Sequence, residues 1–166
     1  MSDTNDKSGD FRERAVLLAR GNRYEDFEPG RMFEHHLGRT LTEGDNIAFT
    51  TLTLHYNPLY FNDAFARANG HDGLVANPLL VFNIVFGLSV EDLSEGGGPF
   101  LGVDDLSFLR PVRVGETLLA RSRVLDRRPS DKFKGYGIVS WATEGFTPEG
   151  ETVVTFQRSN LVRYRQ

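Results

Sequence analysis

The sequence predicts an α+β fold in which a curled antiparallel sheet wraps around one central apolar helix. The helix is predicted over residues 78–93, where the positions from 79 to 88 are apolar nearly all round, and such a helix has to be enclosed by other structure. Four strand candidates follow it, at residues 100–109, 117–125, 135–144 and 151–162, separated by turns that carry glycine or proline. Several antiparallel strands after one buried helix indicate packed α and β layers.

The elements before the central helix are shorter. Residues 1–10 are small and polar, so we expect disorder there, followed by a short helix over residues 11–20. Residues 1–22 are therefore predicted to form a flexible N-terminal segment, and residues 23–166 a single domain. Within that domain the patterns predict a strand, then a helix capped by Thr42 with Asp45, then a short helix ending at Asn69-Gly70; these three span residues 31–41, 43–54 and 63–68.

The start of the central helix has two signals in adjacent positions. Asn77 is a favoured N-cap residue, and Pro78 suits the first helical position, where a missing N–H costs nothing. Unpaired N–H groups at such a terminus carry positive partial charge. Gly96-Gly97-Gly98 follows the helix as a flexible joint and not as a phosphate-binding loop, because no helix comes after it.

Composition excludes several classes of function. The chain has 166 residues, 39% hydrophobic residues, no cysteine and a net charge of −4. It therefore offers no disulfide framework and no thiolate nucleophile, and its acidity argues against a nucleic-acid partner. The longest apolar run falls short of a membrane span, and the acidic N-terminus has no apolar stretch of a secretory signal. We expect a cytoplasmic protein without a membrane partner.

The most informative stretch is His55-Tyr56-Asn57-Pro58-Leu59-Tyr60. Pro58 fixes its own φ and keeps Asn57 out of the helical region, so the preceding helix ends here and the side chains lie on a turn. His55 titrates near neutral pH and is a candidate for proton transfer. Tyr60 is a weaker base that can donate a proton or orient water. Asn57 is interpreted first as a turn former and second as a group that positions water.

This stretch resembles the Asp-x-Asn-Pro-x-His turn of the MaoC-like enoyl-CoA hydratases, a family with the hot-dog fold. Asn57 and Pro58 match, whereas His55 stands at the position of the family's Asp and Tyr60 at that of its His. The resemblance covers residues 24–163 and includes the segments 24–30, 42–45 and 110–118. Residues 79–94 are further similar to hydratases that act on mesaconyl-CoA or itaconyl-CoA.

The resemblance implies reversible addition of water to an α,β-unsaturated CoA thioester, with no cofactor beyond the CoA of the substrate. Catalytic roles would fall to His55 and Tyr60. Asn77 and the N–H groups after Pro78, beginning with that of Leu79, would face the thioester oxygen as it gains charge. Arg110 belongs to a basic group, spread over residues 110–134, that could attract CoA phosphates or an acyl carboxylate. Asn77 can equally be only an N-cap, and many of the basic residues only a solvated face.

The other histidines and the serines give weaker indications of function. His71 is interpreted as a solvent-facing loop residue, and His35 and His36 should point to opposite faces of a strand. With no cysteine and no third ligand at suitable spacing, we predict no metal site. Ser107, Ser140 and Ser159 have no surrounding pattern of a nucleophile.

Two alternatives to a hydratase stay open. The altered pair of residues allows a non-catalytic binding protein for acyl-CoA or acyl carrier, or one subunit of a hetero-oligomer whose partner carries the intact pair. A hot-dog thioesterase is disfavoured, because its central helix usually has an early acid, whereas the first acids here are Glu91 and Asp92. A homodimer or higher homo-oligomer is expected, since the long strands have few prolines to protect their edges.

Overall fold

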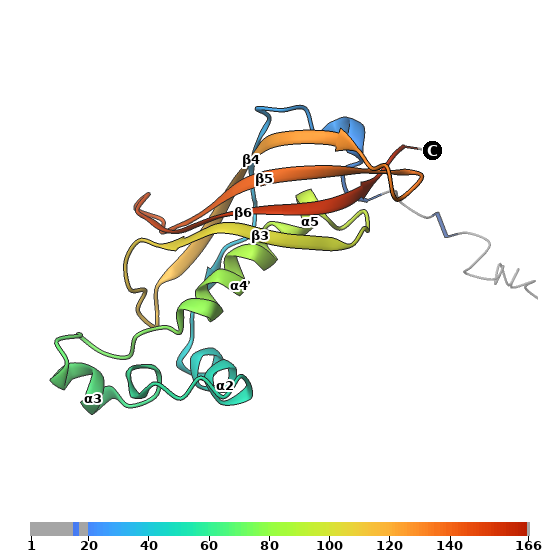
Figure 1. The fold of residues 1–166 in the computed structure, drawn as a ribbon. Helices are drawn as coiled ribbons and strands as arrows, with labels where there is room; N and C mark the ends of the chain where they lie inside the picture. Colours follow the sequence, from blue (N-terminus) through green and yellow to red (C-terminus); the bar gives the residue numbers. More distant parts are fainter. Residues whose placement is uncertain (1–14, 17–19, 166) are drawn as a thin grey trace, which may run out of the picture.

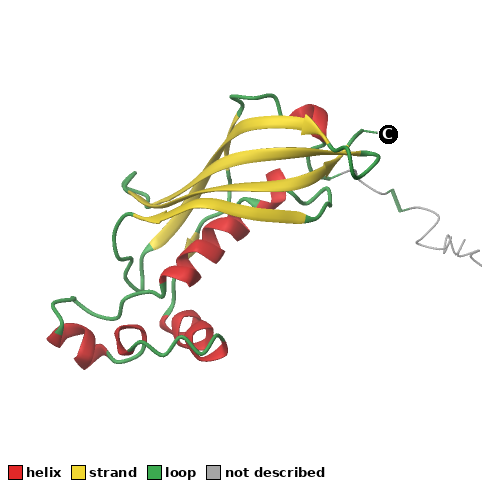
Figure 2. Ribbon diagram, viewed as in Figure 1, coloured by secondary structure: helices red, strands yellow, loops and turns green. Residues whose placement is uncertain are grey.

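A curled antiparallel sheet and one helix across its inner face make up most of the molecule (Figures 1 and 2). The computed structural model describes residues 15, 16 and 20–165. The sheet follows the order β1-β4-β5-β6-β3, and β2 pairs with β4 beside β1. Its long strands are β3 (Phe100–Phe108), β4 (Thr117–Pro129), β5 (Tyr136–Phe146) and β6 (Thr152–Arg163). All four strand predictions are confirmed, with β4 extending four residues further than expected.

Helix α4 (Pro78–Leu88) is the predicted central helix, and it lies against the concave side of the sheet (Figure 1). Leu80, Val81 and Val85 are buried in a core shared with β4 and β6. Gly145 of β5 permits the close approach of this helix, because a Cβ built there would lie 2.4 Å from Cγ2 of Val85. The α+β architecture with a sheet curled around an apolar helix is confirmed.

Enclosure of the helix is less complete than its composition predicts. The sheet is unclosed, and on the side of α4 away from it Leu79 is 41% exposed, while Asn83 and Gly87 are exposed as well. The expectation of one helix over residues 78–93 is also wrong in its second half. Ser89 interrupts it, donating its hydroxyl hydrogen to the Phe86 carbonyl at 2.7 Å, and a separate short helix α5 (Val90–Leu93) follows.

The single strand expected over residues 31–41 is in fact two short strands, β1 (Met32–Glu34) and β2 (Arg39–Thr40). Both pair with β4, but residues 35–38 stand opposite only residues 119–120, because Glu34 pairs with Arg121 and Arg39 with Leu118. The two extra residues break the ladder. His35 is buried and His36 exposed, so they do point in opposite directions, although they lie in the β1–β2 connection and not in a strand.

Three short helical elements extend from one end of the sheet, next to the start of α4 (Figure 1). They are α2 (Glu43–Leu52), the 3-10 turn η2 (Pro58–Tyr60) and α3 (Asp63–Ala68). The predicted cap of α2 is confirmed, since the Thr42 hydroxyl accepts from the Asp45 N–H and the Asp45 carboxylate accepts from the Thr42 N–H. The α2 helix ends two residues earlier than expected because Leu54 adopts a left-handed φ of 57°.

The amino-terminal part of the chain is described only from residue 20 onward, apart from residues 15 and 16. The expected disorder of residues 1–10 and most of the expected helix at residues 11–20 lie outside the described residues, so the division at residue 22 stays a prediction. The first described element is the 3-10 turn η1 (Tyr24–Asp26). None of the helices in the described part of the chain has the length and apolarity to cross a membrane.

Candidate functional site

The turn after α2 and the first turn of α4 meet at one end of the sheet, and together they bring His55, Tyr60 and Asn77 into contact. Nδ2 of Asn77 lies 3.2 Å from Nδ1 of His55. The rings of His55 and Tyr60 meet edge to face, with centroids 5.4 Å apart. Sequence segments more than twenty residues apart therefore supply one polar cluster.

Asn57 and Pro58 shape the turn that holds this cluster. The side-chain oxygen of Asn57 accepts from the Leu59 N–H at 3.1 Å, and Pro58 occupies the first position of η2. The interpretation of Asn57 as a turn former is confirmed, whereas a contact with substrate stays a prediction. The backbone of His55 is fixed as well, because its N–H donates to the Thr50 carbonyl at 3.0 Å.

Two buried residues of α2 support the site and escaped the sequence analysis. Nδ2 of Asn46 donates to the carbonyls of Tyr60, at 2.7 Å, and Val75, at 3.0 Å, while its Oδ1 accepts from the Asn77 N–H at 2.7 Å. Thr50 accepts from the Asn77 side chain at 3.2 Å. Asn46 thus ties three backbone segments together. A polar residue on a largely apolar helix was the one available signal.

The hydrogen bonds of Asn77 assign the tautomer of His55. Oδ1 of Asn77 caps α4 by accepting from the Leu79 N–H at 3.0 Å, so the amide nitrogen faces both Thr50 and His55. An amide nitrogen only donates, and Nδ1 of His55 is therefore the acceptor. The proton of the neutral imidazole then sits on Nε2. In this arrangement His55 is a hydrogen-bond donor and not a ready base.

The same cap changes which backbone N–H is available at the start of α4. Leu79 had been predicted to face a substrate oxygen, but its N–H is engaged by Asn77. Asn77 itself has its N–H and its side chain committed to Asn46, Leu79, Thr50 and His55. Within residues 20–165 no acceptor lies against the N–H of Leu80, which makes it the first free donor of the helix terminus.

Tyr60 lines a cleft of about 400 Å³ between η2, the start of α4 and the end of β3. Its walls are mostly apolar, formed by Leu59, Val75, Ala76, Pro78, Val81, Phe108, Leu109 and Val112. Burial raises the pKa of Tyr60, although a hydrogen bond with Asn57 opposes the rise. The phenol consequently stays protonated at neutral pH and can donate but not accept a proton.

His71 also lines this cleft, together with Arg110 and Pro111. Its interpretation as a solvent-facing loop residue misses this placement, since the loop after α3 folds back toward η2 and the N–H of Val75 bonds the Leu59 carbonyl at 3.1 Å. The cleft therefore has an imidazole and a phenol in its wall, with a second imidazole beside the phenol.

Arg110 reaches the cleft already paired. Its guanidinium contacts the carboxylates of Glu116, at 2.7 and 3.2 Å, and Glu151, at 2.9 Å. Burial would raise the pKa of Glu116, but the hydrogen bonds from Arg110 and from the Arg113 backbone lower it. Two carboxylates around one guanidinium leave no net positive charge, so the geometry does not favour the predicted attraction of a phosphate or carboxylate by Arg110.

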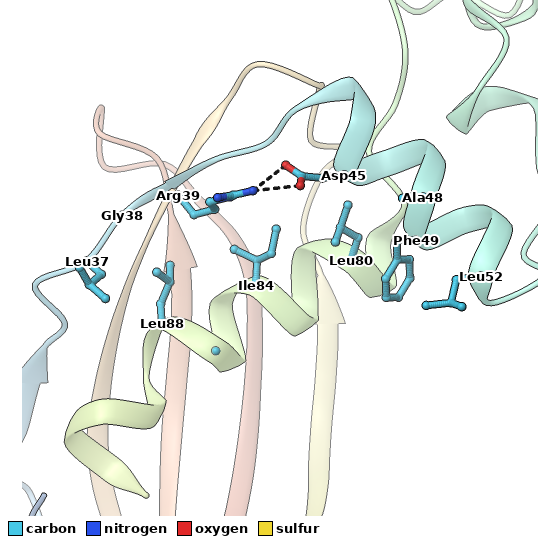
Figure 3. Close-up of a pocket in the computed structure, with 11 residues that line it drawn as sticks. Leu37, Gly38, Arg39, Asp45, Ala48, Phe49, Leu52, Leu80, Ile84 and Leu88 are labelled. Atoms are coloured by element: carbon cyan, nitrogen blue, oxygen red, sulfur yellow. Dashed lines mark hydrogen bonds and ion pairs between the residues drawn. The ribbon is translucent and has the colours of Figure 1, made fainter. Parts of the chain in front are cut away.

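A second, larger groove runs along the other side of α4 (Figure 3). It encloses about 620 Å³ between α4, α2 and the β1–β2 connection, and Leu80, Ile84 and Leu88 form its floor. Arg39 and Asp45, the two charged residues in its lining, pair with each other at 2.9 Å at the rim. The groove suits a hydrocarbon chain and offers no partner to a free carboxylate.

The remaining candidate residues do not form a metal centre. In the described ranges of the chain, no three His, Cys, Asp or Glu side chains are grouped so that they could hold a metal ion. His35 instead bonds Asp92 through Nδ1, at 2.6 Å, and Ser122 through Nε2, at 2.9 Å. This cluster lies at the far end of α4, where the side chain of His35 is buried and that of Asp92 is 32% exposed.

Comparison with known proteins agrees with the fold. Residues 2–166 match the model of the mesaconyl-CoA hydratase family. The chain is 37% identical over 155 residues to the mesaconyl-CoA hydratase of Haloarcula marismortui, covering 93% of this chain and 43% of that protein. This chain thus spans less than half the length of that relative.

Solved structures give the same picture. A protein described as a MaoC domain dehydratase from Chloroflexus aurantiacus superposes with a TM-score of 0.83 and 32% identity, over 92% of this chain and 43% of that one. A Mycobacterium tuberculosis protein with a double hot-dog fold superposes with a TM-score of 0.77 and 24% identity, over 87% of this chain and 45% of that one. The expected hot-dog fold is confirmed.

Proposed function

Because this chain belongs to the mesaconyl-CoA hydratase family, we propose that it catalyses the reversible addition of water to an enoyl-CoA thioester. The observation that carries the proposal is the meeting of His55 and Tyr60, from the family's turn, with the free terminus of α4 beside an apolar cleft. The acyl group would lie in this cleft. A short branched dicarboxylic acyl group is one candidate, by analogy with the relatives' names.

The donors of the site are suited to the oxygen of the thioester. Nε2–H of His55 and the N–H of Leu80 would both face this oxygen as it becomes enolate-like, and the positive end of the α4 dipole would add to them. A neutral imidazole beside a helix N-terminus can polarise a carbonyl without carrying charge. His55 would thus act as an electrophile in place of the base that the sequence allowed.

Proton transfer would then fall to the two residues of the cleft wall. His71 would accept a proton as water adds to the β-carbon, and Tyr60 would give its proton to the α-carbon. Return of the proton from His71 to Tyr60 closes the cycle. These steps would need no cofactor, and the requirement for only the CoA of the substrate stays a prediction from the sequence.

We further propose that two hot-dog units work as a pair, either two copies of this chain or this chain and a second unit. Strand β3 is an edge of the sheet that, in the described part of the chain, has a partner on one side only, β6. Three of its apolar side chains are exposed: Phe100 by 51%, Leu101 by 48% and Phe108 by 41%. Pairing along β3 would cover this edge. Light scattering at micromolar concentration should give a dimer or larger species, and a monomer would count against pairing between copies.

The two alternatives from the sequence would give different products from an acyl-CoA. A binding protein or a subunit without its own acid–base pair would hold acyl-CoA unchanged, and a thioesterase would release free CoA. The binding protein or subunit is favoured over the thioesterase, because the tautomer of His55 leaves the turn at residues 55–60 without a base. A cytoplasmic location stays a prediction.

The test is incubation of the purified chain with a panel of enoyl-CoA thioesters that includes mesaconyl-CoA, itaconyl-CoA and crotonyl-CoA, followed by mass spectrometry of the thioester. Gain of one water supports the hydratase. Free CoA would identify a thioesterase, and unchanged thioester with measurable binding would identify a binding protein.

A further inference from the structure

One arginine in the core has no counter-charge. Arg158 of β6 faces α4, and none of its surface is exposed. Among the residues that the structure describes, no carboxylate pairs with it, and burial alone lowers its pKa to about 10. Removing one partner of a buried ion pair is costly because an uncompensated charge remains, so a native buried cation without any carboxylate requires an explanation.

The atoms around Arg158 also lack hydrogen-bond partners. Nε and Nη1 of Arg158 are buried and unbonded, as are the indole N–H of Trp141 and the side-chain oxygen of Asn160. Trp141 stands directly opposite Arg158 in the β5–β6 ladder, and Asn160 is two residues further along β6 on the same face. Three donor nitrogens in this cluster thus have no partner among the described residues, two of them in the charged guanidinium itself and one in the indole of Trp141.

Nearby groups compensate this charge only in part. Nη2 of Arg158 donates to the Ser89 carbonyl at 3.4 Å, at the C-terminal end of α4. The guanidinium lies 4.4 Å from the ring centre of Phe86 and 5.4 Å from that of Trp141. Aromatic faces and helix carbonyls attract a cation, but neither uses the three free donors.

We propose that Arg158 and Trp141 form the binding site of a small carboxylate, held beneath the junction of α4 and α5. The carboxylate oxygens would accept from the free N–H groups of both residues and neutralise the guanidinium. Binding there would strengthen the end of α4, where His35 also bonds Asp92 of α5. Nothing in the proposed hydration chemistry uses this cluster.

Access to the site would pass two aromatic rings. Phe86 covers Arg158 from the helix side and packs edge-on against Phe100 of the edge strand β3, with ring centroids 5.3 Å apart. Phe86 is half-buried and Phe100 half-exposed. Rotation of these two side chains would open the way from solvent.

The carboxylate has two possible sources, a free small acid or the far end of a dicarboxylic acyl-CoA. The second source rests on the proposed function, and it requires the acyl group to span the distance from the thioester site to Arg158. Leu80, at the candidate thioester site, and Phe86 are six residues apart, or about 9 Å along the helix, and Phe156 packs against both Phe82 and Phe86 between the two places. A free acid is therefore the favoured source.

The first arm of the test measures the unfolding temperature of the full chain against sodium acetate concentration, with sodium perchlorate holding ionic strength constant. Parent protein should gain about 3–8 °C at saturation. Arg158→Met, which keeps an unbranched apolar stem without the charge, should gain nothing. Equal gain in both proteins would overturn the proposal and leave Arg158 as a cap of α4.

A second variant, Trp141→Phe, keeps the test decisive if Arg158→Met fails to fold. Trp141→Phe keeps a ring against the guanidinium but removes the indole donor, so acetate should bind several-fold more weakly. The smaller ring lowers basal stability, so each protein is compared with itself without acetate. An unchanged acetate dependence in Trp141→Phe would remove Trp141 from the site and contradict the proposal as stated.

The second arm separates the two sources of the carboxylate. If the acyl group supplies it, Arg158→Met should lower kcat/KM at least tenfold on a dicarboxylic enoyl-CoA and leave crotonyl-CoA unaffected. Equal effects on both substrates, with acetate dependence present in the first arm, would establish a free acid as the ligand. If the parent hydrates neither substrate, the proposed function fails while the first arm still decides the site.

Discussion

The side-chain nitrogen of Asn77 donates to Nδ1 of His55 across 3.2 Å, and this contact fixes which ring nitrogen of His55 carries the proton. The orientation of the amide is set by the cap of α4, through the Leu79 N–H. A residue that begins a helix thereby decides whether the neighbouring imidazole offers a donor or a lone pair.

Replacing Asn77 by Asp should reverse this tautomer. A carboxylate still caps α4 but cannot donate to Nδ1, so Nδ1 takes the proton and Nε2 is left with a lone pair. Nitrogen NMR of labelled histidine should report a protonated Nε2 in the parent and a protonated Nδ1 in Asn77→Asp. The same protonated nitrogen in both proteins would contradict the assignment.

Loss of Asn46 should destabilise the chain strongly. Asn46→Ala leaves the carbonyls of Tyr60 and Val75 and the N–H of Asn77 buried without partners, and we expect a loss of about 3–5 kcal/mol of unfolding free energy. Urea unfolding measures it. Thr51→Ala, on the exposed face of the same helix, is the control and should change stability by less than about 0.5 kcal/mol.

Leu54 precedes His55 with a φ of 57° and is 72% exposed. An L side chain in this region costs about 1–2 kcal/mol, so Leu54→Gly should stabilise the protein by about 0.5–1 kcal/mol. Ala48→Gly, at an exposed position inside α2, should instead destabilise by about 1 kcal/mol. Thermal unfolding of both variants should therefore move in opposite directions, and a loss of stability in both would refute the strain at Leu54.

His35 should make stability depend on pH. Burial lowers its pKa below 6.5, although the hydrogen bond that His35 donates to Asp92 opposes this, and the charges of Arg158 and His36 add to the lowering. Between its folded pKa and 6.5 the unfolded chain binds the extra proton, so this contribution to stability is present above pH 6.5 and is lost as pH falls through the window.

His35→Gln should remove that dependence, and the gap in unfolding free energy between parent and variant should narrow as pH falls from 7.5 to 5. Urea unfolding at several pH values gives the gap. His36→Gln, at an exposed position, is the comparison variant: it should keep most of the pH dependence, because the charge of His36 makes the smallest contribution to the lowered pKa of His35. If the difference in unfolding free energy between parent and His35→Gln stayed constant with pH, His35 would not resist protonation in the folded chain.

Local patterns were enough to predict the four long strands and the start of α4, because alternation and capping act within a few residues. The break between β1 and β2 could not be predicted, since it arises where two residues of β4 stand opposite the four residues 35–38 that connect β1 and β2. The same limit applies to Asn46, whose partner Asn77 is 31 residues away. His71 and Arg158 likewise acquire their surroundings only when distant strands and loops pack.

The central claim is that His55 acts on the substrate within this chain's own cleft. Its most direct test is the steady-state hydration rate of the best enoyl-CoA for the parent, His55→Ala and Tyr60→Phe proteins, with folding checked by circular dichroism. Loss of the oxyanion donor should lower kcat by about 10²–10³ in His55→Ala, and loss of the proton donor should lower it by about 10²–10⁴ in Tyr60→Phe. A folded His55→Ala protein that hydrates at the parent rate would contradict the account.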